Sequence, residues 1–127
     1  MEIEPVRTEA APPAIGPYSQ GVRAGRYLFT SGQLPMTPAG ELIVDDVREA
    51  ARQAFSNLRA VLAAARADIR SVAKVTIYLV RMEDFAAVNA VYAETFSEPY
   101  PARSTIGVKS LPKGSPLEVE AIALIEG

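Results

Sequence analysis

The chain has 127 residues and carries 13 Lys and Arg against 15 Asp and Glu, which gives a formal net charge of −2 at pH 7. This length is typical of one domain, and we expect a single domain over residues 1–127. The sequence contains neither cysteine nor histidine, which excludes disulfide bridges, thiolate nucleophiles, Ser-His-Asp triads and histidine-ligated metal sites.

Charge and hydropathy narrow the class of protein further. Basic residues are spread along the chain, which argues against a protein that binds nucleic acid through a basic patch. The sequence lacks the apolar run of about 18 residues that a membrane-spanning helix requires. The acidic start, MEIEPVRTEAAPP, lacks the apolar segment of a secretory signal. We therefore expect a cytoplasmic protein that binds neither nucleic acid nor membranes.

The first half of the chain predicts a loop, two strands and a long helix. Residues 10–20 are rich in proline and glycine and predict the loop. RYLFTSG (26–32) and ELIV (41–44) each predict a strand, with a turn region between them. Asp46 can cap the helix that follows, and Glu49 resembles the second member of a capping box. The apolar stripe of this helix comprises Val47, Ala51, Ala54, Leu58, Val61 and Ala65.

The second half predicts three strands and a second helix. The strands are SVAKVTIYLV (71–80), STIGVK (104–109) and LEVEAIALI (117–125), with a turn over 111–116 before the last of them. MEDFAAVNAVYAETF (82–96) predicts the helix. One side of that helix carries Phe85, Val88, Tyr92 and Phe96.

Two helices are enough to cover only one face of the sheet that these strands would form. The strands are nevertheless apolar on both faces: Val75 and Ile77 point one way, while Tyr78 and Val80 point the other. An exposed apolar face of several hundred Å² is unusual in a monomer. We therefore predict an α+β fold whose second sheet face is buried against other copies of the chain.

One arginine and two glutamates stand out among the charged residues. PYP (99–101) excludes a helix and stiffens the chain just before Arg103. Glu118 and Glu120 alternate with apolar residues in the last strand. An isolated glutamate in a strand is usually solvated. Burial of this face would instead place at least one glutamate at a subunit boundary, where it needs a partner such as Arg103.

Six segments, in order, cover nearly the whole chain and carry a family resemblance: AIGPYSQ (14–20), LFTSGQLP (28–35), ARQAFSNLRAVLAAA (51–65), KVTIYLVRMEDFAAVNAVYAETF (74–96), PARSTIGV (101–108) and LPKGSPLEVEAIA (111–123). The chain resembles the RidA/YjgF family of reactive-intermediate (enamine/imine) deaminases. This resemblance implies a chorismate-mutase-like α+β fold with a mixed β-sheet, two helices on one face and a homotrimer with clefts between subunits. It also implies hydrolysis of 2-iminobutanoate and 2-iminopropanoate to 2-oxo acids and ammonia, with no cofactor or metal.

The resemblance assigns catalytic roles to three residues. Arg103 would anchor the substrate carboxylate through two parallel hydrogen bonds, as the planar guanidinium allows. Glu118, and not Glu120, would activate the attacking water and return the proton to the leaving amine. Tyr18 would border the pocket from its loop and hydrogen-bond the substrate or the water.

Four further residues would help to bind the substrate. Ser31 and Gly32 would line the pocket wall, and Asn89 would support the site. Thr105 stands where some family members carry cysteine, and it leaves the Arg103 anchor intact. Taken alone, these residues have ordinary structural roles. A serine before a glycine is common in turns, and an asparagine commonly caps a nearby backbone group through a hydrogen bond.

Besides Thr105, the chain departs from the family pattern in two further places. Arg66 stands where the family commonly has a glycine ending the first helix. A left-handed non-glycine residue costs roughly 1 kcal/mol, so we expect this helix end to be built differently. Val80–Arg81 replaces a more usual threonine–aspartate pair and would alter a rim. Two alternatives to deamination stay open: a trimer that binds small carboxylates without turnover, and a protein-protecting or translation-inhibiting factor.

Overall fold

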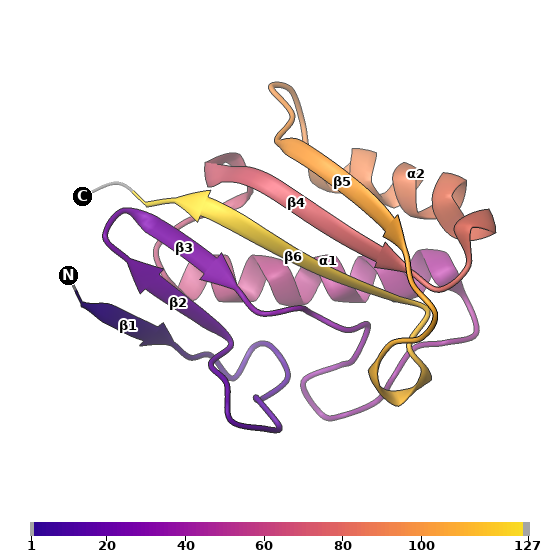
Figure 1. Ribbon diagram of the computed structural model, residues 1–127, viewed down its shortest axis with the longest axis horizontal. Coiled ribbons are helices and arrows are strands. Elements are labelled where there is room, and N and C mark those ends of the chain that lie inside the picture. The colour runs from indigo at the N-terminus through magenta and orange to yellow at the C-terminus, as the bar shows by residue number, and fades with distance from the viewer. Residues whose placement is uncertain (1, 126–127) are drawn as a thin grey trace.

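The computed structural model describes residues 2–125. Its centre is a six-stranded sheet in the order β1-β2-β3-β6-β4-β5, and both helices cover the same face of it (Figure 1). β4 and β5 pair in parallel, and the other neighbours are antiparallel. The elements are β1 (Ile3–Val6), β2 (Gly21–Ala24), β3 (Tyr27–Thr30), α1 (Val47–Ala64), η1 (Ile69–Ser71), β4 (Val72–Leu79), η2 (Met82–Asp84), α2 (Phe85–Thr95), β5 (Ala102–Gly107), η3 (Pro112–Gly114) and β6 (Leu117–Leu124). The predicted α+β fold, with a mixed sheet and two helices on one face, is confirmed.

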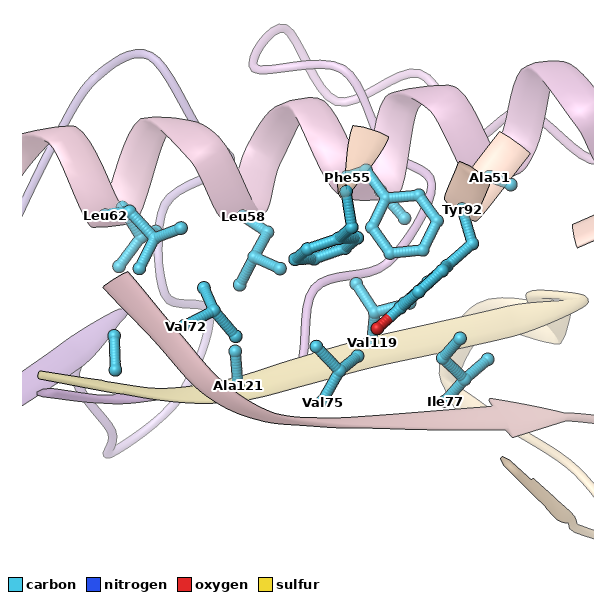
Figure 2. Packing of buried hydrophobic residues seen from close by; sticks show 14 of the residues in the cluster. Ala51, Phe55, Leu58, Leu62, Val72, Val75, Ile77, Tyr92, Val119 and Ala121 are labelled. Carbon is cyan, nitrogen blue, oxygen red and sulfur yellow. The ribbon is translucent and has the colours of Figure 1, made fainter. Parts of the chain in front are cut away.

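The hydrophobic core lies between the helices and the sheet. Figure 2 shows Phe55 and Leu58 of α1 facing Val75 and Val119 of the sheet, and none of these four side chains is more than 1% exposed. Phe55 also meets Tyr92 of α2 edge-on, with ring centroids 5.9 Å apart. Burying a side chain of this size contributes about 1.5–3 kcal/mol, so this layer fixes both helices on the sheet.

Asp46 caps the N-terminus of α1 as predicted, whereas Glu49 does not complete a capping box and instead accepts a hydrogen bond from Arg52 at 2.9 Å. The Asp46 carboxylate accepts hydrogen bonds from the backbone N–H groups of Arg48 and Glu49, at 2.9 and 3.3 Å. These donors have no partner inside the helix, and the negative charge also complements the positive end of the helix dipole.

The C-terminus of α1 contradicts the prediction made for Arg66. This residue has a φ of 63°, so it adopts the left-handed conformation that favours glycine. Its N–H donates to the carbonyl of Ala63 at 3.0 Å, and the N–H of Ala67 donates to that of Leu62 at 2.9 Å. These two bonds form a Schellman motif. The helix therefore ends in the ordinary way, and the expectation of a differently built end was wrong.

The N-terminal part of the sheet differs from the prediction. Residues 41–44 are not a strand: Leu42 forms one isolated bridge with Met36, and the N–H of Ile43 donates to the carbonyl of Pro35 at 2.8 Å. The structure adds β1 and β2, which the sequence did not reveal. Each has only four residues, and the proline in β1 is tolerated because this strand lies at an edge.

Two buried amide side chains fix the loops beside the sheet. Asn57 is fully buried in α1, and its Nδ2 donates to the carbonyls of Leu34 and Met36 at 3.0 and 2.8 Å. Gln20 is 4% exposed. It binds both the N–H and the carbonyl of Thr8, at 2.7 and 3.0 Å. Buried loop backbone needs such partners, because it has no neighbouring strand to bond with.

We use the term open face for the sheet surface opposite α1 and α2. It carries large apolar side chains that are about half exposed: Tyr27, Phe29, Ile106 and Leu124. The rings of Tyr27 and Phe29 lie 6.2 Å apart, and these residues pair with Leu124 and Ile122 of β6. The described chain therefore has a second apolar face, as predicted. In residues 2–125, no helix is long and apolar enough to cross a membrane.

Candidate active site

The first set of predicted site residues surrounds Arg103, near the start of the edge strand β5. Its Nη1 donates to Oδ1 of Asn89 at 2.7 Å. Its Cζ lies 4.6 Å from the ring centroid of Tyr92 and 5.6 Å from that of Phe85. A guanidinium that stacks on aromatic rings and makes a directed hydrogen bond has a defined orientation. Helix α2 therefore positions the Arg103 side chain. The proline-containing segment 99–101 comes just before Arg103 in the chain.

A hollow of about 370 Å³ opens beside this guanidinium. Its lining consists of Asn89, Tyr92, Ala93, Tyr100, Pro101 and Arg103. Thr105 lies two residues further along β5 and borders a shallower depression with Phe85, Asn89 and Arg103. We call Arg103, Asn89 and Thr105 the arginine group.

The second set surrounds Glu118 in β6. Its neighbours Leu117 and Val119 are fully buried toward the helices, so the Glu118 side chain points to the open face. Gly32 packs directly against this side chain. A Cβ atom added to Gly32 would lie only 2.6 Å from Cδ and 2.9 Å from Cγ of Glu118. Glycine at position 32 therefore makes room for the carboxylate.

The environment of Glu118 favours its protonated form. Burial is the main cause of its raised pKa, and the charge of nearby Glu120 adds to the effect. Tyr78, which pairs with Glu118 across β4 and β6, also has a raised pKa, first through burial and then through Glu120 and Glu118. A carboxylate with a raised pKa is a stronger base, so it is suited to accept a proton during catalysis.

Tyr18 lies beside the Glu118 set rather than beside Arg103. It lines a small pocket together with Gly32, and its side chain is 51% exposed. The Tyr18 hydroxyl oxygen accepts the N–H of Ile15 at 3.4 Å. This leaves the hydroxyl proton available to a ligand at the pocket mouth.

Ser31 joins the same set through its backbone position next to Gly32. Its Oγ donates to the carbonyl of Ser19 at 2.5 Å, so the hydroxyl ties the preceding loop to the end of β3. We call Tyr18, Ser31, Gly32 and Glu118 the glutamate group. Within it, Ser31 holds the loop, while Gly32 shapes the space around the carboxylate.

The arginine group and the glutamate group lie on opposite faces of the sheet. Arg103 pairs with Val75 of β4, whose side chain is buried toward the helices. Glu118 pairs with Tyr78 instead, and adjacent residues along β4 alternate between faces. One chain therefore does not bring Arg103 and Glu118 together, a point that the sequence left open.

A family model described as Endoribonuclease L-PSP matches residues 8–125. The chain belongs to the RidA/YjgF family. Among its relatives, a RutC family protein of Pyrococcus horikoshii is 48% identical over 97% of this chain and 98% of that protein. A protein of Capra hircus named 2-iminobutanoate/2-iminopropanoate deaminase is 47% identical, over 94% of this chain and 88% of its own length.

Solved structures agree with this assignment. The crystal structure of E. coli TdcF with bound serine matches with a TM-score of 0.91 at 40% identity, and covers 97% of this chain and 99% of that one. The predicted RidA/YjgF membership is thus confirmed. Imine deamination is an activity that relatives in this family are named for.

The sequence did not reveal that aromatic rings of the second helix pack against the guanidinium of Arg103. Phe85 and Tyr92 were assigned only to the apolar stripe of the second helix, yet Phe85 is 39% exposed and both rings face Arg103. The spacing of Phe85, Asn89 and Tyr92 places all three on one helical face, which was the available signal. In residues 2–125, no group of three or more acidic side chains is arranged to hold a metal ion.

Proposed function

We propose that this protein is a hydrolytic deaminase of 2-imino acids, converting 2-iminobutanoate and 2-iminopropanoate to 2-oxo acids and ammonia. We also propose that it works as a homotrimer, in which the arginine group of one copy faces the glutamate group of a neighbour. The proposal makes Arg103, Glu118 and Tyr18 the catalytic residues. Ser31, Gly32, Asn89 and Thr105 complete the binding site.

The observation that carries this proposal is the fixed guanidinium of Arg103. Among residues 2–125, Asn89 is its only hydrogen-bond partner, and this bond uses Nη1 alone. The remaining N–H groups can bind a substrate carboxylate in the bidentate geometry that suits arginine. Every 2-imino acid has a carboxylate next to the reacting carbon. Anchoring it therefore fixes where water must attack.

Glu118 supplies the proton transfers that hydrolysis needs. Water adds to the imine carbon while Glu118 takes a proton from it, and the C=N electron pair moves to nitrogen. The protonated carboxyl then returns the proton to nitrogen. The carboxylate then carries a second proton from the hydroxyl of this adduct to its nitrogen, so that the C–N bond breaks, the C=O bond forms and ammonia leaves. General acid–base catalysis of this kind contributes about 10²–10⁴-fold in rate, and the raised pKa of Glu118 makes its carboxylate a stronger base toward the attacking water.

Assembly follows from the placement of the two groups. Because Arg103 and Glu118 lie on opposite faces of one sheet, a site that uses both requires two copies of the chain. The apolar open face gives a surface that a second copy can bury. The deaminase name of the Capra hircus relative and the serine bound to TdcF support a site for small amino-acid-like carboxylates.

The test generates 2-iminobutanoate in situ from threonine with a dehydratase, in the presence of semicarbazide as a competing trap. We expect the wild-type protein to form 2-oxobutanoate faster than the trap captures the imine. Arg103→Ala and Glu118→Gln should both lose this advantage, while Arg48→Gln, an exposed arginine on α1, should keep it.

Ligand binding separates the deaminase from a carboxylate-binding trimer. Glu118→Gln should still bind a small carboxylate such as 2-oxobutanoate, and Arg103→Ala should not. If wild-type protein binds the carboxylate but matches the protein-free control in the trap assay with both imines, the binding-only alternative replaces the deaminase.

A further inference from the structure

A second charged hollow lies apart from both site groups. It has a volume of about 520 Å³, and its lining consists of Arg26, Arg66, Asp68, Arg70, Ser71 and Leu124. These residues come from the start of β3, the segment between α1 and β4, and the end of β6. Figure 1 shows that these segments meet at the end of the sheet where α1 terminates. The proposed deamination uses none of them.

The lining has a strong excess of positive charge. Within residues 2–125, three guanidinium groups face one carboxylate in this hollow, although the whole chain carries a net charge of −2. The carboxylate of Asp68 is already engaged in structure. Its Oδ1 accepts the backbone N–H of Arg70 at 2.8 Å and caps η1, and its Oδ2 lies 3.7 Å from Nη2 of Arg70. Arg26 and Arg66 face the hollow with no such ion pair within residues 2–125.

Backbone strain at Arg66 is an independent observation. Its φ of 63° is a conformation that glycine adopts freely and that side chains with a Cβ adopt at a cost in stability. The Schellman motif at this position would form at least as well with glycine. A strained residue that directs an arginine into a cationic hollow indicates a use for that side chain beyond folding.

We propose that this hollow binds a small polyphosphate anion, either free pyrophosphate or the diphosphate part of a nucleotide. Guanidinium groups match phosphate oxygens through paired N–H donors. Three of them around one hollow suit a ligand with more than one phosphate. Among residues 2–125, Leu124 is the only apolar residue in the lining, and no aromatic residue lines it. The phosphates, rather than a stacked base, would therefore be recognised.

Calorimetric titration of the assembled protein with pyrophosphate, at low ionic strength, tests this proposal. Arg66→Gly is the most informative variant, because glycine suits the backbone and the fold is retained. We expect Arg66→Gly and Arg70→Gln each to weaken binding roughly tenfold, since each removes charge-assisted hydrogen bonds. Arg48→Gln makes the same charge change on a different surface and should leave the affinity unaltered. Added salt should weaken binding to the wild-type protein, as screening of exposed charges requires.

Further titrations identify the source of the phosphates. Equal affinity for ADP and pyrophosphate would show that the phosphates alone are recognised. Tighter binding of ADP would show that the hollow is a nucleotide site. Either result supports the proposal if Arg66→Gly weakens the binding.

The proposal fails if millimolar pyrophosphate gives no binding heat, or if Arg48→Gln weakens binding as much as Arg66→Gly. It also fails if single-stranded RNA binds and pyrophosphate does not displace it. Imine hydrolysis by Arg66→Gly should match the wild type, so these results are independent of the proposed deaminase activity.

Discussion

Arg103 and Glu118 lie on opposite faces of one sheet, the first against the rings of α2 and the second against Gly32 on the open face. A reaction that uses both side chains therefore needs two chains. In a single chain, the two groups that the proposed chemistry joins are therefore separated.

Inactive variants should restore each other's activity if the site lies between copies. In a random trimer of Arg103→Ala and Glu118→Gln chains, each site has an intact Arg103 and an intact Glu118 in about one quarter of cases. We expect co-expressed variants to release ammonia from 2-iminobutanoate at up to that fraction of the wild-type rate. Either variant alone should be inactive. A mixed preparation that is confirmed by mass and stays inactive would contradict a shared site.

Gly32→Ala should impair the reaction while leaving the fold intact. The new methyl group would collide with the Glu118 carboxylate and displace it. A displacement of about 1 Å in a catalytic group costs on the order of 10²-fold in rate. We expect kcat to fall by about this factor, with circular dichroism and oligomeric mass unchanged. Unaltered kcat would show that the position of Glu118 is not critical.

The raised pKa of Glu118 predicts a pH-dependent effect on stability. A carboxyl whose pKa is higher in the folded state stabilises the fold fully below its unfolded pKa, and this stabilisation is lost as the pH rises through the folded pKa. Glu118→Gln cannot ionise, so it avoids this loss. Urea unfolding at fixed protein concentration should show the variant gaining stability relative to wild type as the pH rises above about 4.3, the ordinary pKa of a glutamate. A difference that does not change with pH would contradict the raised pKa.

Arg66→Gly should stabilise the protein. The substitution relieves the left-handed strain at the end of α1, although glycine also adds freedom to the unfolded chain. We expect a net gain of up to about 1 kcal/mol in the free energy of unfolding. Thermal unfolding compared with Arg48→Gln measures this effect. A lower melting temperature for Arg66→Gly would show that the guanidinium stabilises the fold more than its backbone strains it.

Tyr92→Phe separates packing from hydrogen bonding beside Arg103. Among residues 2–125, the buried Tyr92 hydroxyl has no hydrogen-bond partner, and burying a hydroxyl in this way is unfavourable. Its removal should stabilise the protein by about 1 kcal/mol. The ring that stacks on Arg103 stays, so imine hydrolysis should be retained. Destabilisation in a denaturant titration would indicate a partner, such as ordered water, for the hydroxyl.

The sequence predicted the elements with strong periodicity and failed where the signal was short. The helix from Asp46 and the last strand were predicted close to their observed limits, because burial on one face imposes a regular apolar pattern. β1 and β2 were missed, since a strand of only four residues carries little pattern. In ELIV (41–44), Ile43 is apolar because it packs against the core, and the segment forms one isolated bridge rather than a strand.

The candidate residues were predictable, but their division into two groups was not. Alternation alone places Glu118 opposite Leu117 and Val119. The face on which Arg103 lies depends on its pairing with Val75, and the sequence gives no information on that register. The aromatic support of Arg103 likewise needed the position of α2 relative to β5.

The buried amide of Asn57 links the wall of the candidate site to the interior of the molecule. Asn57 binds the carbonyl of Leu34, and the adjacent Gln33 exchanges backbone hydrogen bonds with Val119, next to Glu118. Amide protons along this path should therefore exchange with deuterium only when the core itself opens. We therefore expect the pocket wall to be ordered before a ligand arrives, so that little conformational entropy is lost there when the ligand binds.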